Sequence, residues 1–280
     1  MANTSLRTRF ATGLILIALA TALILALPTP LLAVLFGAVV LLGASEWAAL
    51  IEMNRAVYVP LVGGGLAAGW LLVQDTGTTI GLLIVAVAVW MVGLFLVWRY
   101  PALPPWWRIR SVQALAGFLI LVPAWAALVV LHSGRLLPEG SDGHHYTLFL
   151  MTLVWVADSA AFFAGRRFGK RRLAPHVSPA KTIEGLLGAV FATVLAALVG
   201  VWWLSIGMER GGMFVVLCVL TLLSSVLGDL MESVLKRTQG AKDSGTLLPG
   251  HGGVLDRIDS LTAASPVFVL GLVVLWSWTP

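Results

Sequence analysis

Residues 78–98 read TTIGLLIVAVAVWMVGLFLVW, a stretch without a single charged side chain. A helix needs about 20 mainly apolar residues to cross the hydrocarbon core of a bilayer. The stretch has this length and this composition, so it predicts a helix that spans a membrane.

Similar stretches recur along the chain of 280 residues, of which 59% are hydrophobic and only 11% are charged. Soluble domains usually carry about 25% charged residues. The first stretch is interpreted as a retained helix rather than a cleaved signal peptide, because a second span follows it immediately. We therefore expect an all-α, polytopic integral membrane protein with about nine transmembrane helices, at residues 10–28, 30–52, 57–73, 78–98, 112–131, 147–165, 184–206, 212–235 and 259–278.

The basic residues predict the orientation, because cytoplasmic loops of membrane proteins are rich in Lys and Arg. If the N-terminus is cytoplasmic and the spans alternate, 16 of the 18 Lys and Arg residues lie inside, and Arg135 and Arg210 lie outside. The net charge of +5 is then mainly a topology signal, and nucleic-acid binding is not expected. We divide the chain into residues 1–135, an N-terminal region with about five spans, and residues 136–280, a C-terminal catalytic region with cytoplasmic loops at 166–183 and 236–258.

The eighth expected helix ends in a charged face. Its polar residues are three, four, seven and eight positions apart, so they share one broad side of the helix; they are Asp229, Glu232, Ser233, Lys236 and Arg237. With a rise of about 1.5 Å per residue, Asp229 lies roughly 10 Å deeper than Lys236. A carboxylate at that depth needs a protein-lined or watery cavity and a cation. The pattern indicates a functional site, with a structural ion pair to a neighbouring helix as the alternative.

The loop after this helix combines basic side chains with acids and closely spaced glycines. Its cationic or ionisable donors are Lys236, Arg237, Lys242, Arg257 and His251, and its acids are Asp243, Asp256 and Asp259. Arg and Lys neutralise phosphate oxygens, glycines let backbone N–H groups approach an anion, and carboxylate oxygens suit Mg²⁺. Together they predict a phosphoryl- or nucleotidyl-transfer site.

Residues 233–259 also resemble the signature of a known family, the phosphatidate cytidylyltransferases (CDP-diacylglycerol synthases). Every fixed position of that signature is matched, by Ser233, Lys236, Arg237, Lys242, Asp243, Gly245, Leu248, Pro249, His251, Gly252, Gly253, Asp256, Arg257 and Asp259. A second stretch, residues 155–185, is similar to an upstream motif of the family, with Phe162 and Phe163 where the family often has tyrosine. These motifs lie within residues 150–260, and the N-terminal half matches in hydropathy only.

The resemblance implies that CTP and phosphatidic acid, a membrane lipid, react to give CDP-diacylglycerol and pyrophosphate. The expected place is the bacterial inner (cytoplasmic) membrane, with the active site on the cytoplasmic side. The implied cofactor is Mg²⁺, with a second cation left open, and the implied metal ligands are Asp229 and Asp256. A homodimer is expected from the family alone.

The resemblance also implies individual roles. The expected catalytic residues are Asp229, Lys236, Asp256 and Ser233, and the expected substrate-binding residues are Arg237, Lys242, His251, Gly252, Gly253, Arg257, Lys181 and Arg166. For Asp158 and Glu184, a structural ion pair and a catalytic role both stay open, and Glu232 receives no role.

Two other functions are weighed. A CTP-dependent lipid or polyprenol kinase would also need CTP, a metal and a membrane, but the spacing of the polar residues in 233–259 favours the cytidylyltransferase. A transporter would favour inverted repeats and ionisable groups near the midplane of the membrane. This chain instead places its polar residues in two loops on one expected side.

Overall fold

The computed structural model describes residues 17–241, 243–245 and 252–277. The helices are α2 (Thr29–Leu50), α3 (Arg55–Leu72), α4 (Thr76–Arg99), α5 (Arg110–Ser133), α6 (Gly143–Phe168), α7 (Ile183–Trp203), α8 (Met208–Thr238) and α9 (Leu255–Ser277), with a short 3-10 helix at Pro105–Arg108. The strands β1 (Arg172–Ala174) and β2 (Ser178–Thr182) pair in antiparallel register.

Eight of these helices are long and apolar enough to cross a membrane, within the part of the chain that the structure describes. They coincide with eight of the nine expected spans to within a few residues, which confirms the all-α, polytopic fold class. The remaining expected span, 10–28, lies partly outside the described residues, and its described part forms the shorter apolar helix Ile17–Ala26.

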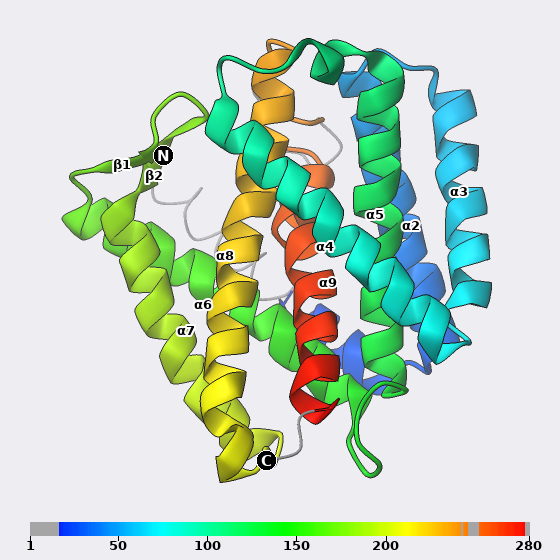
Figure 1. The fold of residues 1–280 in the computed structure, drawn as a ribbon, viewed down its shortest axis with the longest axis vertical. Coiled ribbons are helices and arrows are strands. Elements are labelled where there is room, and N and C mark those ends of the chain that lie inside the picture. Colours follow the sequence, from blue (N-terminus) through cyan, green and yellow to red (C-terminus); the bar gives the residue numbers. More distant parts are fainter. Residues whose placement is uncertain (1–16, 242, 246–251, 278–280) are drawn as a thin grey trace, which may run out of the picture.

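Helix α5 lies at the centre of the bundle. In its most apolar window 78% of the residues are buried, and it packs against α2, α3, α4, α6 and α9 (Figure 1). The outer helices α3, α4 and α7 leave large apolar side chains exposed, among them Leu71, Trp98 and Trp202. An apolar surface of this kind is suited to contact with lipid rather than with water.

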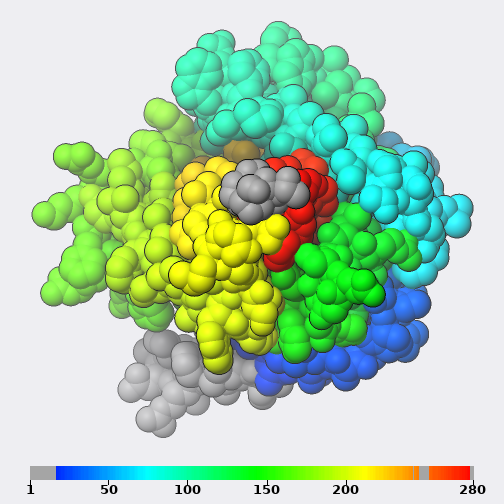
Figure 2. Space-filling model, turned by 60° about the horizontal axis from the view of Figure 1, so that its bottom comes forward, coloured from blue at the N-terminus to red at the C-terminus, as the bar shows by residue number. Residues whose placement is uncertain are grey.

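The connections between helices gather at two ends of the bundle. One end carries the α2–α3 and α4–α5 connections, the β1–β2 hairpin, and the residues where α8 ends and α9 begins (Figure 1). The other end carries the α3–α4, α5–α6 and α7–α8 connections (Figure 2). Of the Lys and Arg residues that the structure describes, only Arg135 and Arg210 lie toward this second end. We call the first the basic end.

The two expected polar loops are shorter than the sequence suggested. Helix α8 continues to Thr238 and α9 begins at Leu255, so the second loop loses residues at both of its ends. The first loop contains the β1–β2 hairpin, and Arg166 belongs to the last turn of α6. Hydrogen bonds explain the early start of α9, because buried carboxylates accept from the N–H groups of Gly253, Val254 and Leu255.

Candidate active site

Helices α8 and α9 approach closely at the basic end because Gly228 has no side chain. A Cβ atom at this position would collide with the backbone carbonyl oxygen of Asp259. The contact places the C-terminal turns of α8 beside the N-terminal turns of α9. The charged residues of both helices therefore meet, although a long connection separates them in the sequence.

Asp229 forms an ion pair with Lys181, which comes from strand β2. The Nζ atom of Lys181 lies 2.6 Å from Oδ2 of Asp229, and the two side chains are 25% and 35% exposed. The Ser233 hydroxyl, one turn further along α8, lies 3.5 Å from the other Asp229 oxygen. This half of the site is therefore partly open to water.

A second ion-pair group lies closer to the interior. The Nζ atom of Lys236 is 2.9 Å from Oε2 of Glu232 and 2.5 Å from Oδ1 of Asp256, and the Lys236 side chain is only 11% exposed. The other Asp256 oxygen accepts hydrogen bonds from the Ser244 hydroxyl at 2.9 Å and the Gly253 N–H at 2.8 Å. One lysine thus balances two carboxylates that protein surrounds on most sides.

Two further carboxylates lie near the Asp229–Lys181 pair. Asp259 in α9 is buried, accepts from the Ser260 N–H at 2.7 Å, and lies within electrostatic range of Asp229 and Lys181. Asp158 in α6 also lies within electrostatic range of Asp229 and Lys181. We call the set Asp158, Lys181, Asp229, Glu232, Lys236, Asp256 and Asp259 the charged cluster.

Glu184, for which the sequence left two roles open, contacts the backbone beside the hairpin. Its carboxylate accepts hydrogen bonds from the backbone N–H groups of Lys170 and Arg171, at 3.0 and 3.2 Å. These bonds fasten the start of the hairpin to the first turn of α7. Glu184 therefore holds the hairpin that carries Lys181, whereas Asp158 lies at the charged cluster itself.

The expected site residues differ in their surroundings. The structure brings together Lys181, Asp229, Ser233, Lys236 and Asp256. Arg166, Arg237 and Arg257 are exposed at the basic end, outside these ion pairs. Gly252 adopts a φ of +79°, which favours glycine, and the neighbouring Gly253 is buried. Lys242 and His251 lie outside the described residues.

The sequence analysis missed Glu46 of α2 and Ser244. The Glu46 carboxylate is 5% exposed and accepts hydrogen bonds from the N–H groups of Val254 and Leu255 at 3.0 and 2.7 Å. A signal was present, because Glu46 is an acid inside the expected span 30–52, and such acids are functional candidates. The N-terminal half thus contacts the segment that leads to Asp256.

The donor atoms of the charged cluster suit a hard cation. They are carboxylate and hydroxyl oxygens, which Mg²⁺ prefers. Among the described residues no group of three or more His, Cys, Asp or Glu is arranged to hold a metal by itself. That finding is compatible with Mg²⁺, which is usually bound by one or two carboxylates together with substrate phosphates and water.

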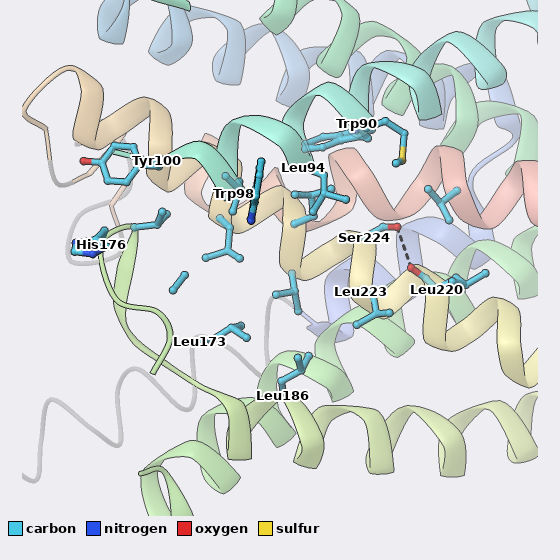
Figure 3. A pocket seen from close by; sticks show the side chains of 18 of the residues that line it. Trp90, Leu94, Trp98, Tyr100, Leu173, His176, Leu186, Leu220, Leu223 and Ser224 are labelled. Atoms are coloured by element: carbon cyan, nitrogen blue, oxygen red, sulfur yellow. Dashed lines mark hydrogen bonds between the residues drawn. The ribbon is translucent and has the colours of Figure 1, made fainter. Parts of the chain in front are cut away.

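An apolar groove lies between α4, α7, α8 and the β1–β2 hairpin (Figure 3). Its volume is about 750 Å³, and its walls come from α4, α7, α8 and the hairpin. The lining includes Trp90, Leu94, Trp98, Leu173, Leu186, Leu220 and Leu223. Val226 and Leu230 of α8 also line it, three positions before and one position after Asp229. The groove therefore reaches the same turns of α8 as the charged cluster, although none of the cluster's residues lines it.

Fold and site together define a polytopic membrane enzyme whose charged cluster lies where its last two spanning helices meet at the basic end. The chain belongs to the cytidylyltransferase family, whose model matches residues 7–275. The match thus extends well beyond the motif region recognised in the sequence, into the N-terminal half.

Curated relatives agree with this assignment. The phosphatidate cytidylyltransferase of Pseudomonas aeruginosa is 40% identical over 276 residues, which cover 97% of each chain. That of Haemophilus influenzae is 38% identical over 252 residues, 84% of this chain and 88% of the relative. A Staphylococcus aureus protein of the same name is 41% identical over 133 residues, 48% of this chain and 51% of the relative.

Proposed function

We propose that the chain is a phosphatidate cytidylyltransferase, which transfers the cytidylyl group of CTP to phosphatidic acid and releases pyrophosphate. The family and the names of its relatives support this function. The structural observation that carries the proposal is the pairing of Asp229 and Asp256 with two different lysines at one end of the bundle. This arrangement places anionic and cationic groups together where a nucleotide and a lipid headgroup could both reach them.

The reaction joins two anions. An oxygen of the phosphatidic acid phosphate attacks the α-phosphorus of CTP, the bond from that phosphorus to the β-phosphate oxygen breaks, and pyrophosphate leaves. Because the attacking phosphate is already ionised, no general base is needed. The main obstacle is charge repulsion, which preorganised cations reduce by stabilising the transition state.

We assign different roles in this reaction to the residues of the charged cluster. Lys181 is partly exposed and has one close carboxylate partner, Asp229, so its ammonium group is suited to contact a phosphate oxygen. Lys236 keeps the Asp256 carboxylate in place. Bound Mg²⁺ would supply charge neutralisation for the phosphate oxygens, and Asp229 and Asp256 are the residues we propose to hold it. The Ser233 hydroxyl, 3.5 Å from Asp229, is a further donor on the same face of α8.

Further substrate contacts are proposed at the basic end. Arg166, Arg237 and Arg257 are exposed there and can form charge-assisted hydrogen bonds to phosphate groups. Gly252 allows a backbone approach to an anion. Gly253, whose N–H donates to Asp256, is proposed for substrate binding on the basis of the sequence motif alone. Lys242 and His251 are proposed for the CTP triphosphate on the basis of the sequence motif alone.

The orientation and the cellular place are also proposals. The basic end carries most of the described Lys and Arg residues, so we place it on the cytoplasmic side of the bacterial inner membrane. There CTP would arrive from the cytosol and phosphatidic acid from the adjacent leaflet. A homodimer remains an expectation from the family, and the mass of the purified protein in detergent, measured by light scattering, tests it.

A double-label assay tests the function. Purified protein is incubated with phosphatidic acid, Mg²⁺ and CTP labelled on either the α- or the γ-phosphate, and the lipid is extracted. A cytidylyltransferase puts only the α-label into lipid, whereas a CTP-dependent kinase puts only the γ-label there. Label from γ-CTP in the lipid, or no labelled lipid at all, would refute the proposal.

A further inference from the structure

Glu46 is buried near the C-terminal end of α2 without a cationic partner among the described residues. Its oxygens accept hydrogen bonds from the Val254 and Leu255 N–H groups and from the Ser244 hydroxyl, at 3.0, 2.7 and 3.3 Å. A buried carboxylate is costly unless it is well hydrogen-bonded. Here the first N–H groups of α9, at the positive end of the helix dipole, compensate the charge.

Glu46 and Asp256 both contact Ser244 and Gly253, from two sides. The Ser244 hydroxyl lies 2.9 Å from Oδ2 of Asp256 and 3.3 Å from Oε2 of Glu46, and the Ser244 N–H also donates to Asp256. Gly253 donates its N–H to Asp256, and a Cβ atom at Gly253 would lie only 2.6 Å from Glu46. The two carboxylates thus flank Ser244 and Gly253 with no room for a larger residue at position 253.

This arrangement connects Glu46 to the charged cluster, because Glu46 contacts the start of the helix that carries Asp256. Asp256 lies in the first turn of α9, and Glu46 binds the N–H groups at which that turn begins. The position of the Asp256 carboxylate therefore depends on where Glu46 holds the start of the helix. A misplacement of about 1 Å at a reacting centre can cost as much as 10²-fold in rate.

We propose that Glu46 is a positioning residue: it fixes the start of α9 and Ser244, so that Asp256 is held in its working place beside Lys236. The N-terminal half of the chain then takes part in the transfer without touching substrate. The inference rests on the proposed function, since it concerns the efficiency of that reaction.

The test compares Glu46→Gln with Glu52→Gln, a matched control just beyond the same helix. Glu52 is exposed and pairs with Arg110, and we place it outside the active site. In Glu46→Gln the new NH₂ group faces N–H donors in place of an acceptor, so we expect kcat to fall about 10- to 100-fold. The KM for phosphatidic acid should stay within about twofold of the wild-type value, because Glu46 does not contact the lipid.

A second readout needs no activity and no metal. Hydrogen exchange of the Val254 and Leu255 amides, measured by mass spectrometry in metal-free protein, should be faster in Glu46→Gln than in wild type. Glu52→Gln should leave it unchanged. Equal exchange and equal kcat in Glu46→Gln and Glu52→Gln would overturn the inference, provided that wild type forms the lipid product. If wild type forms none, it is the proposed function that fails.

Ser244→Ala keeps the inference testable if Glu46→Gln does not fold. This variant removes only the shared hydroxyl and should lower kcat by about 3- to 10-fold. The Glu46→Gln, Ser244→Ala double variant should be no slower than Glu46→Gln alone to within about twofold, because both changes loosen the same contact. A kcat loss equal to the product of the two single losses would overturn the shared role.

Discussion

The ammonium nitrogen of Lys236, in the last turns of α8, lies 2.5 Å from a carboxylate oxygen of Asp256, in the first turn of α9. The same nitrogen lies 2.9 Å from Glu232. Lys236 therefore joins the two helices across their connection at the basic end. It also holds Asp256 at the same end of the bundle as Asp229, which the proposed function requires.

Removing the Lys236 ammonium should destabilise the protein as well as inactivate it. Lys236→Met leaves the carboxylates of Glu232 and Asp256 close together without their cation, and breaking a buried pair in this way costs about 3–5 kcal/mol. Thermal unfolding in detergent should show a lower Tm for Lys236→Met and a smaller decrease for Lys236→Arg. Lys170→Met, at an exposed position, is the matched control. An unchanged Tm in Lys236→Met would contradict the ion-pair assignment.

Neutralising either proposed metal ligand should stop turnover while the fold persists. Asp229→Asn and Asp256→Asn keep the shape of the side chain but remove its charge, so we expect kcat to fall at least about 10²- to 10³-fold. Both variants should still insert into membranes and purify with the wild-type elution profile. Product formation from CTP and phosphatidic acid is the measurement, and near-wild-type activity in either variant would refute the assignment.

The close approach of α8 and α9 at Gly228 can be tested by substitution of this glycine. Gly228→Ala places a methyl group against the Asp259 carbonyl oxygen, so the helices must separate, at a cost of about 1–3 kcal/mol. Gly212→Ala, on the same helix but with nothing near its Cβ position, should instead stabilise the helix by up to about 1 kcal/mol. Tm values that change in the same direction for both variants would show that the packing argument is wrong.

A pH prediction concerns the opposite end of the bundle. Burial would raise the pKa of Asp142, but hydrogen bonds from the His144 N–H and imidazole and the charge of His145 outweigh it, so the pKa lies below its ordinary value. A lowered carboxyl pKa stabilises the fold above about pH 4 and loses this effect as the pH falls through the folded-state pKa. Asp142→Asn should therefore have a lower Tm than wild type at pH 7, and the difference should vanish in acid. A difference that persists there would exclude the electrostatic cause.

Hydropathy could predict the membrane spans, because a helix that crosses the bilayer needs about 20 mainly apolar residues. The stretch 78–98 became α4, Thr76–Arg99, with only its ends shifted. The start of α9 could not be predicted, because Asp256 and Arg257 are polar and were assigned to the second polar loop. Tertiary hydrogen bonds, such as those from Val254 and Leu255 to Glu46, keep this turn helical.

The residue types of the site could be predicted from the sequence, but the contacts between these residues could not. Spacing alone placed Asp229, Ser233 and Lys236 on one helix face, and the structure confirms that face. The spacing carried no information on which lysine meets which aspartate, because those contacts join elements distant in the sequence. Lys181 reaches Asp229 from strand β2, which precedes α8 by more than 20 residues in the sequence. The role of Glu46 could not be predicted from the C-terminal motif, because its contacts join α2 to a segment about 200 residues later in the sequence.

Binding of Mn²⁺ is the most direct test of the central claim, that Asp229 and Asp256 serve one cation-dependent site. Mn²⁺ takes the same oxygen ligands as Mg²⁺, and its bound fraction can be measured by electron paramagnetic resonance with CTP present. We predict that Asp229→Asn and Asp256→Asn each weaken Mn²⁺ binding by at least about tenfold, while Glu52→Gln binds as wild type does. Wild-type Mn²⁺ affinity in either aspartate variant would contradict the account.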